Sequence, residues 1–158
     1  VFSAHSSDAD GVLAIELGGD GNCTDLLNLP NSGCRVFPDE PGRYIKMQGN
    51  EVFKQAVRNM AECALSVLAQ AGLTSRDVSL LIAHQANIRI IDAVAKRLEL
   101  PKEKAFVNIA DYGNTSAATI PIALCEAFEQ GRINKGDVIV IDAFGAGLTW
   151  GAMALRWA

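Results

Sequence analysis

The sequence predicts an α/β fold with a mostly parallel sheet, and two features of the chain carry this prediction. From residue 49 onward, helical and strand patterns alternate in the order helix, strand, helix, strand, helix, strand, strand. Right-handed crossovers between parallel strands produce that alternation. The strand candidate near residue 140 is continuously apolar, as a strand covered on both faces requires. The last two strands are separated by a short glycine turn and are therefore expected to form an antiparallel hairpin.

The first elements are a strand, a long loop and a long helix. Residues 11–17 suit a strand, whereas residues 18–42 are rich in Gly, Asn, Asp and Pro and predict a long surface loop. From Gly49, apolar residues recur every three or four positions until Gly72. This spacing predicts an amphipathic helix that ends at the glycine.

Two further units follow this helix. Thr74 to Asp77 have the order of a capping box around one helical turn, and residues 79–83 are predicted to form a buried strand. Asn87 is then expected to cap a helix that Pro101 closes. The apolar side of that helix carries Ile88, Ile91, Val94, Ala95 and Leu98.

The remaining elements complete the alternating order. A short strand is expected over residues 105–108, a helix over 114–131 and a strand over 137–144. Gly145 and Gly147 then turn the chain into a last strand over 148–157. Functional groups are expected beyond the carboxyl ends of the parallel strands.

Composition excludes several classes of protein. The chain has 158 residues, of which 49% are apolar and 20% charged, so it is the size of one globular domain. Its apolar runs, such as residues 138–141, are far too short to span a bilayer, and no basic and apolar leader opens the chain. A cytoplasmic location without membrane contact is therefore expected. A start at Val1 rather than Met leads us to expect a fragment or a processed product.

The cysteines and the charge distribution exclude further classes. The four cysteines lie far apart without a Cys-x-x-Cys motif, which argues against a metal site or a disulfide framework. They are Cys23, Cys34, Cys63 and Cys125. Residues 1–42 hold seven acids and one base, whereas residues 43–158 hold eleven acids and thirteen bases. The second part therefore favours an acidic partner, but no dense basic run with aromatics indicates nucleic acid.

His84 and Asn114 are the most informative polar residues. Each is the first polar side chain where an apolar strand or a glycine turn is expected to give way to a helix. An Asn at a helix start usually caps it, and a His after a strand is usually a structural hydrogen-bonding residue. Two neutral donors that converge on one oxygen would instead form an oxyanion site.

The glycine loop over residues 144–151 strengthens the second interpretation. Its glycines permit close backbone approach to a ligand. A dinucleotide site is excluded because Gly145 and Gly147 lead into a strand rather than a helix. The combination favours acyl-group or thioester chemistry.

Four motifs together resemble a known family. They are Gly-Asn-Glu-Val-Phe-Lys (49–54), His-Gln-Ala-Asn-Ile-Arg (84–89), Gly-Asn-Thr-Ser-Ala-Ala (113–118) and Ala-Phe-Gly-Ala-Gly-Leu-Thr-Trp-Gly (143–151). In this order they resemble the C-terminal half of β-ketoacyl-acyl-carrier-protein synthase III, a condensing enzyme of the thiolase superfamily. The likeness covers most of residues 43–158, and residues 1–42 match more loosely.

The resemblance implies one half of a thiolase-like, five-layer α-β-α-β-α fold. Residues 1–42 would be the end of an N-terminal half and a connecting loop, and residues 43–158 the C-terminal half. The complete enzyme, usually a homodimer, would be an acyltransferase that starts type II fatty acid synthesis. A short primer from acyl-CoA acylates a cysteine, and malonyl-acyl carrier protein then loses carbon dioxide and attacks that thioester. No resident cofactor is implied, because CoA and the carrier's phosphopantetheine only carry the substrates.

The resemblance also assigns roles to residues. His84 and Asn114 match the pair that supports decarboxylation. The backbone loop that binds an oxyanion matches Phe144, Gly145, Ala146 and Gly147, although related sequences can hold glycine at the position of Ala146. The wall of the phosphopantetheine tunnel matches Gly49, Asn50, Phe53, Ala86 and Asn87. Carrier docking would fall to Lys54, Arg89, Lys96 and Arg97.

Other interpretations of these residues remain open. Asn50 and Asn87 would equally suit helix caps, and basic side chains on a helix are usually just solvated. The family's nucleophilic cysteine lies in its N-terminal half, and none of the four cysteines here lies in a family motif. The chain alone is therefore expected to be inactive and to expose an apolar face. The alternatives are half of a thiolase, chalcone-synthase-like or hydroxymethylglutaryl synthase enzyme, or a non-catalytic thioester-binding module.

Overall fold

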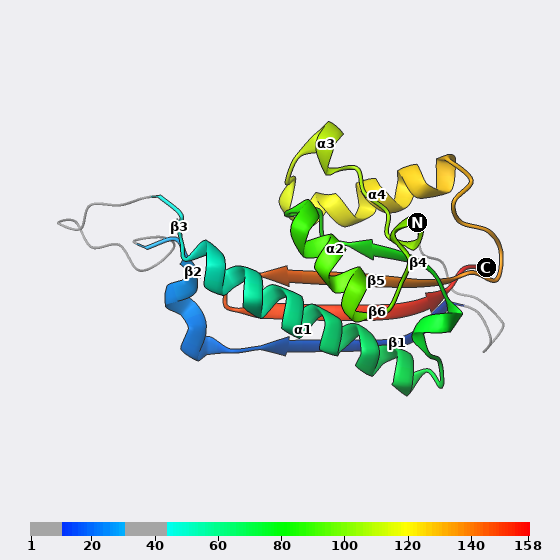
Figure 1. Cartoon of the computed structure of the whole chain (residues 1–158), viewed down its shortest axis with the longest axis horizontal. Coiled ribbons are helices and arrows are strands. Elements are labelled where there is room, and N and C mark those ends of the chain that lie inside the picture. The colour runs from blue at the N-terminus through cyan, green and yellow to red at the C-terminus, as the bar shows by residue number, and fades with distance from the viewer. Residues whose placement is uncertain (1–10, 31–43) are drawn as a thin grey trace.

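The structure, a computed structural model, describes residues 11–30 and 44–158, in which a mixed four-stranded sheet lies between helices (Figure 1). The strand order is β1-β6-β5-β4. The strands are β1 (Gly11–Gly19), β4 (Val78–Ala83), β5 (Val138–Gly145) and β6 (Thr149–Arg156). The α/β class and the antiparallel hairpin of β5 and β6 confirm the prediction from sequence.

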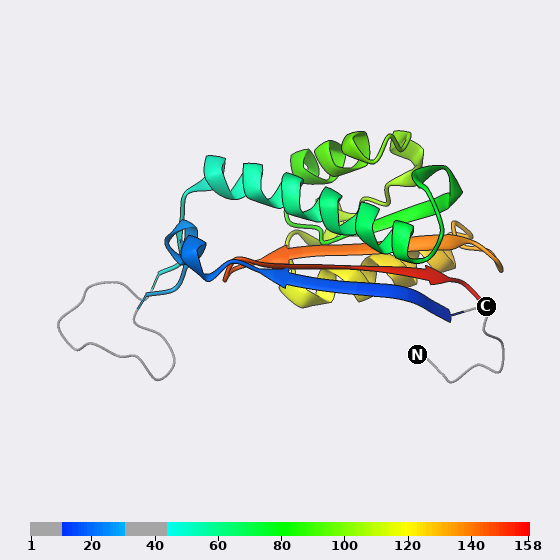
Figure 2. The same ribbon diagram turned by 90° about the horizontal axis from the view of Figure 1, so that it is seen from below.

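Helices cover both faces of this sheet (Figure 2). On one face lie α1 (Gly49–Gln70) and α2 (Ile88–Arg97), and on the other lies α4 (Thr119–Glu129). The short α3 (Ile109–Tyr112) precedes α4. Four 3-10 turns connect the described elements: η1 (Gly21–Leu26), η2 (Ser75–Asp77), η3 (Lys102–Lys104) and η4 (Ser116–Ala118). A two-stranded ladder, β2 (Leu27–Asn28) with β3 (Lys46–Met47), lies near the start of α1.

Two apolar cores result from this layering. The larger core joins α1 and α2 to the sheet through residues such as Met60, Ile91 and Val140. The smaller core joins α4 to the other face through residues such as Ala123 and Ile139. Strand β4 contributes to both cores, as its continuous apolar sequence requires.

Among the described residues, one buried side chain is a carboxylic acid. The side chain of Asp142 on β5 is fully buried, and neither carboxyl oxygen has a hydrogen-bond partner among the described residues. Burial raises the pKa of this carboxyl well above its ordinary value, and a backbone contact from Ala143 opposes the shift only in part. Asp142 is therefore expected to be uncharged in the folded protein.

Parallel pairing is less extensive than the sequence predicts. Only β4 and β5 pair in parallel among the named strands, whereas β1 pairs antiparallel with β6. Strand β1 therefore belongs to the same sheet as the later strands. The strand predicted over 105–108 is reduced to a single parallel bridge between Ala105 and Leu81. The buried side chain of Gln85 forms hydrogen bonds with the carbonyl oxygen of Phe106 and the N–H of Asn108. These two backbone groups are therefore not available for pairing with a neighbouring strand.

The helix predicted over residues 114–131 begins later than expected. Ser116 has a φ of 55°, outside the α-helical range, and residues 116–118 form the 3-10 turn η4, so α4 starts only at Thr119. Pro121 then lies in the first turn of α4, where its missing N–H costs little. The helix ends at Glu129, shortly before Gly131, whose φ of 67° suits a helix stop.

The other predicted elements are placed within a few residues. The capping box at Thr74 and Asp77 and the cap of α2 by Asn87 are both present. On α2, however, Ile88 is exposed rather than on the buried side. The predicted loop over 18–42 contains the end of β1, η1 and β2, and its part from 31 to 42 lies outside the described residues, as do His5 and Cys34.

Candidate active site

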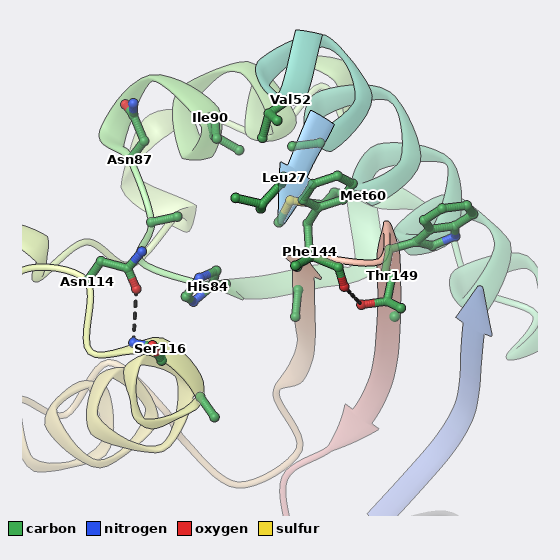
Figure 3. A pocket seen from close by; sticks show the side chains of 18 of the residues that line it. Leu27, Val52, Met60, His84, Asn87, Ile90, Asn114, Ser116, Phe144 and Thr149 are labelled. Atoms are coloured by element: carbon green, nitrogen blue, oxygen red, sulfur yellow. Dashed lines mark hydrogen bonds between the residues drawn. The ribbon is translucent and has the colours of Figure 1, made fainter. Parts of the chain in front are cut away.

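An open pocket of about 1320 Å³ lies where β4 and β5 end (Figure 3). Its wall includes both His84 and Asn114, together with the first turn of α1 and the residues that precede α2. These two side chains therefore come together beyond the carboxyl ends of the parallel strands.

His84 is the first residue after β4. Its backbone N–H donates to the carbonyl oxygen of Asp142 (2.8 Å), which extends the pairing of β4 with β5 and fixes where the side chain leaves the sheet. The ring atom Nδ1 lies 2.6 Å from the hydroxyl oxygen of Thr119. The side chain is half-buried, and this burial lowers the pKa of His84 below its ordinary value. The imidazole is therefore neutral near pH 7.

Asn114 is held by its side-chain oxygen. Oδ1 accepts a hydrogen bond from the backbone N–H of Ser116 (2.9 Å), drawn as the dashed line beside His84 in Figure 3. This bond spans two residues and belongs to a turn, so the prediction that Asn114 starts the helix is wrong. Because the oxygen is occupied, the amide NH₂ is the part of the side chain that remains for a ligand.

Two buried polar residues that support the site were missed from the sequence. Gln85 is 1% exposed; its NH₂ donates to the carbonyl oxygens of Ala83 and Phe106, and its Oε1 accepts from the N–H of Asn108. Thr119 is 2% exposed and touches His84. A polar residue directly after a buried strand, and a hydroxyl near the start of an apolar helix, were the available signals.

The glycine loop lies on the wall opposite the residues of α2. Phe144, Gly145 and Ala146 line the pocket, but Gly147 does not. Gly147 has a φ of 141°, and a Cβ there would lie 2.7 Å from Cγ2 of Thr149, so the position requires glycine. The hydroxyl of Thr149 donates to the carbonyl oxygen of Ala146 (3.1 Å) and holds the turn.

The residues expected to contact a phosphopantetheine arm come together on the pocket wall. All five line it: Gly49, Asn50, Phe53, Ala86 and Asn87. Asn87 does cap α2, because Oδ1 accepts from the N–H of Arg89 (2.9 Å), yet its NH₂ stays available. Asn50 does not cap α1, because the helix starts at Gly49 and Gln48 occupies the cap position.

The four basic residues expected at a docking surface are less tightly grouped. The guanidinium of Arg89 lies 5.6 Å from the centroid of the Phe53 ring, at the pocket wall. Lys54 is exposed and paired with Glu51 (2.7 Å). Lys96 and Arg97 are exposed in the last turn of α2, roughly 15 Å along the helix from its first turn.

None of the three described cysteines lines the pocket. Burial is the main reason that the pKa of the Cys63 thiol rises to about 11. The exposed Cys125 on α4 has its pKa raised by the charge of Glu129, and the pKa of Cys23 is raised by its hydrogen bond to Asp20. These thiols are poor nucleophiles at neutral pH.

Two classes of site find no support in residues 11–30 and 44–158. No group of three or more His, Cys, Asp or Glu side chains there is arranged to hold a metal ion. None of the helices there is both long and apolar enough to cross a membrane.

The chain is similar to a known protein family and to proteins of known function. The model of the 3-oxoacyl-[acyl-carrier-protein] synthase III C-terminal family matches residues 68–157, more than half of the chain. The β-ketoacyl-[acyl-carrier-protein] synthase III of Aquifex aeolicus is 48% identical over 157 residues, covering 99% of this chain and 48% of that protein. The enzyme of the same name from Bacillus pumilus is 52% identical over 151 residues, covering 96% of this chain and 45% of that protein.

The solved structures agree with the sequence comparison. The crystal structure of 3-oxoacyl-[acyl-carrier-protein] synthase III from Aquifex aeolicus superposes with a TM-score of 0.87 at 49% identity. The superposition covers 97% of this chain and 46% of that one. The chain thus spans about half the length of the curated relatives it matches.

Proposed function

The chain belongs to the 3-oxoacyl-[acyl-carrier-protein] synthase III family, and we propose that it supplies the decarboxylating half of a condensing enzyme that starts fatty acid synthesis. In this proposal the complete enzyme transfers a short acyl group from acyl-CoA to a cysteine outside this chain. It then joins that group to the two-carbon unit of malonyl-acyl carrier protein. The observation that carries the proposal is the placement of His84 and Asn114 on the wall of one pocket, each with a side-chain nitrogen free for a ligand.

These donors suit the decarboxylation step. Loss of carbon dioxide from a malonyl thioester leaves an electron pair that spreads onto the carbonyl oxygen as an enolate. An N–H from neutral His84 and an N–H from Asn114 would stabilise this oxygen without placing a full positive charge in a half-buried site. The enolate carbon then attacks the acyl thioester, and the cysteine thiolate leaves.

Two further observations support a need for a second half. None of the described thiols lines the pocket, which supports a nucleophile supplied by the other half of the enzyme. In addition, Glu16 of β1 bonds Ser66 and Gln70 of α1, so the alternating neighbours Ile15 and Leu17 point to the opposite face. They are 51% and 81% exposed.

Helix α4 covers only part of this face of the sheet (Figure 2). Its Phe128 is also 54% exposed. Large exposed apolar side chains such as these mark a packing interface when they lie together. We propose that the cysteine-bearing half packs there and closes the pocket.

The residues proposed to meet the acyl carrier protein lie at the mouth of the pocket. Asn50 and Asn87 line the wall that a phosphopantetheine arm would follow, and Arg89 lies beside them. A cationic side chain at the mouth would attract an acidic carrier protein. Lys54 directly follows Phe53 on α1. Lys96 and Arg97 would extend the positive electrostatic potential along α2.

The test separates the two half-reactions of the complete enzyme. His84→Ala and Asn114→Ala should each slow malonyl decarboxylation by about 10²- to 10³-fold, the usual loss for one oxyanion donor. Acylation of the cysteine by acyl-CoA should stay partly intact. Asn134→Ala, which removes an exposed amide outside the pocket, is the matched control and should change neither step.

Other outcomes would favour the rival functions. Equal loss of both half-reactions in the His84 and Asn114 variants would contradict the assigned roles. A complete protein that binds malonyl thioesters but neither decarboxylates nor condenses them would be a non-catalytic binding module. Condensation by the isolated chain would refute the need for a second half.

A further inference from the structure

The imidazole of His84 is held by a hydroxyl that has two neighbours. Oγ1 of Thr119 lies 2.6 Å from Nδ1 of His84 and 3.0 Å from the carbonyl oxygen of Ser116. Thr119 is 2% exposed, so water does not replace either contact. A threonine hydroxyl has one proton to donate and lone pairs with which to accept. Only one of the two neighbours can therefore receive that proton at any moment.

The position of this proton fixes the tautomer of a neutral His84. If the hydroxyl donates to Nδ1, the ring proton is on Nε2, which then acts as a donor. If the hydroxyl donates to Ser116, Nδ1 carries the ring proton and donates to Oγ1, and Nε2 presents a lone pair. The heavy atoms keep the same positions in both arrangements, because each contact is within hydrogen-bonding distance.

We propose that Thr119 is a positioning residue for His84: its hydroxyl fixes the plane of the imidazole and, by turning its proton between Nδ1 and the Ser116 carbonyl, lets Nε2 serve as donor or acceptor in place. This inference rests on the proposed function, in which His84 donates to an enolate oxygen. It adds a residue outside the pocket wall to the machinery that prepares this donor.

The same peptide segment also orients Asn114. The N–H of Ser116 donates to Oδ1 of Asn114, and the carbonyl oxygen of Ser116 lies 3.0 Å from Oγ1 of Thr119. Ser116 has a φ of 55°, which is uncommon for a residue other than glycine. In this conformation its N–H faces Asn114 and its carbonyl oxygen faces Thr119. One residue thus sets the direction of both donors, directly for Asn114 and through Thr119 for His84.

The experiment measures kcat and KM for malonyl decarboxylation by the complete enzyme. Thr119→Val removes the hydroxyl and keeps the side-chain shape, and we expect kcat to fall about tenfold or more because the imidazole loses its anchor. KM should change less than about twofold, since Thr119 does not line the pocket. Thr119→Ser, which restores the hydroxyl, should recover most of the rate.

A control substitution tests whether the effect is specific to the hydroxyl of Thr119. Thr24→Val makes the same chemical change at an exposed position that does not line the pocket, and it should leave kcat unaltered. Full activity of Thr119→Val, or a Thr119→Ser enzyme as slow as the valine variant, would overturn the proposal. If the valine variant does not fold, Thr119→Ala replaces it in the experiment. A lower kcat for Thr119→Ala than for Thr119→Ser supports the proposal. Equal kcat values for these two variants overturn it.

Failure of this inference differs from failure of the proposed function. If His84→Ala and Asn114→Ala both decarboxylate at the unaltered rate, the proposed function is wrong and the role of Thr119 falls with it. If those two variants are slow and Thr119→Val is fast, only the role of Thr119 is refuted.

Discussion

Replacing Asp142 should stabilise the protein, and the gain should depend on pH. The carboxyl is buried against apolar neighbours without a hydrogen-bond partner among the described residues, and burial raises its pKa well above the ordinary 3.8. The folded state therefore keeps a proton that the unfolded chain releases once the pH exceeds about 3.8. Unfolding releases a proton across that interval, so rising pH favours the unfolded state.

The slope follows from this proton count. One proton bound in the folded state and absent in the unfolded state lowers the free energy of unfolding by about 1.36 kcal/mol for each pH unit. The loss begins near pH 3.8 and stops once the pH passes the raised pKa of the folded protein. Asp142→Asn keeps the shape and removes the titration, so its advantage over the native residue should grow by about 2.7 kcal/mol over two pH units in that interval.

Urea denaturation at a series of pH values measures this directly. Asp142→Asn should be more stable than the native protein at pH 7, and the difference should shrink toward pH 4. Asp142→Val should add about 1–3 kcal/mol near pH 4, because no unpaired polar group stays in the core. Its advantage over the native protein should then grow with pH as for Asp142→Asn, because valine also removes the titrating group. Asp25→Asn, at an exposed position, provides the baseline for loss of one acidic group. Parallel stability curves for the native and Asp142→Asn proteins from pH 4 to pH 7 would refute the reasoning.

Three further predictions concern the support of the site and its mouth. Gln85→Leu should lower the free energy of unfolding by about 1–3 kcal/mol, because the N–H of Asn108 loses its buried hydrogen-bond partner. Urea denaturation measures this change. A difference within about 0.5 kcal/mol, the size of an ordinary surface substitution, would contradict the prediction. Gly18→Ala would place a Cβ 2.3 Å from Nε1 of Trp150, so it should lower the thermal midpoint, and an unaltered midpoint would show that the indole moves freely. Arg89→Ala should lower kcat/KM for a carrier-bound malonyl substrate more than for a small thioester, with the gap closing at high salt; equal effects on both substrates would count against docking.

The sequence predicted the elements whose signals are local. The spacing of apolar residues defined α1 within two residues at its end, and Asn87 caps α2 as its position indicated. The pocket position of His84 followed from the end of an apolar strand. These features depend on neighbouring residues along the chain and on periodicity, which a single sequence contains.

The errors arose where distant residues decide the conformation. Nothing within residues 11–19 indicates that β1 pairs antiparallel with β6, so the sheet was expected to be more parallel than it is. The late start of α4 depends on the backbone of Ser116, which an amino-acid pattern does not reveal. The contact between Thr119 and His84 joins residues 35 positions apart and needed the folded chain to be seen.

The pairing of β1 with β6 has a consequence for biosynthesis. Gly11 lies opposite Arg156, so the edge strand β1 cannot join the sheet before residues 149–156 have been synthesised. Until then, the ribosome-bound chain carries β1 as an unpaired apolar segment, while β4 and the helices are already complete. Such a long-range closure is slow, and it leaves an edge open to association with other chains. Removal of residues 149–158 would delete all of β6 and detach β1 from β5, although both of these strands would remain intact in sequence.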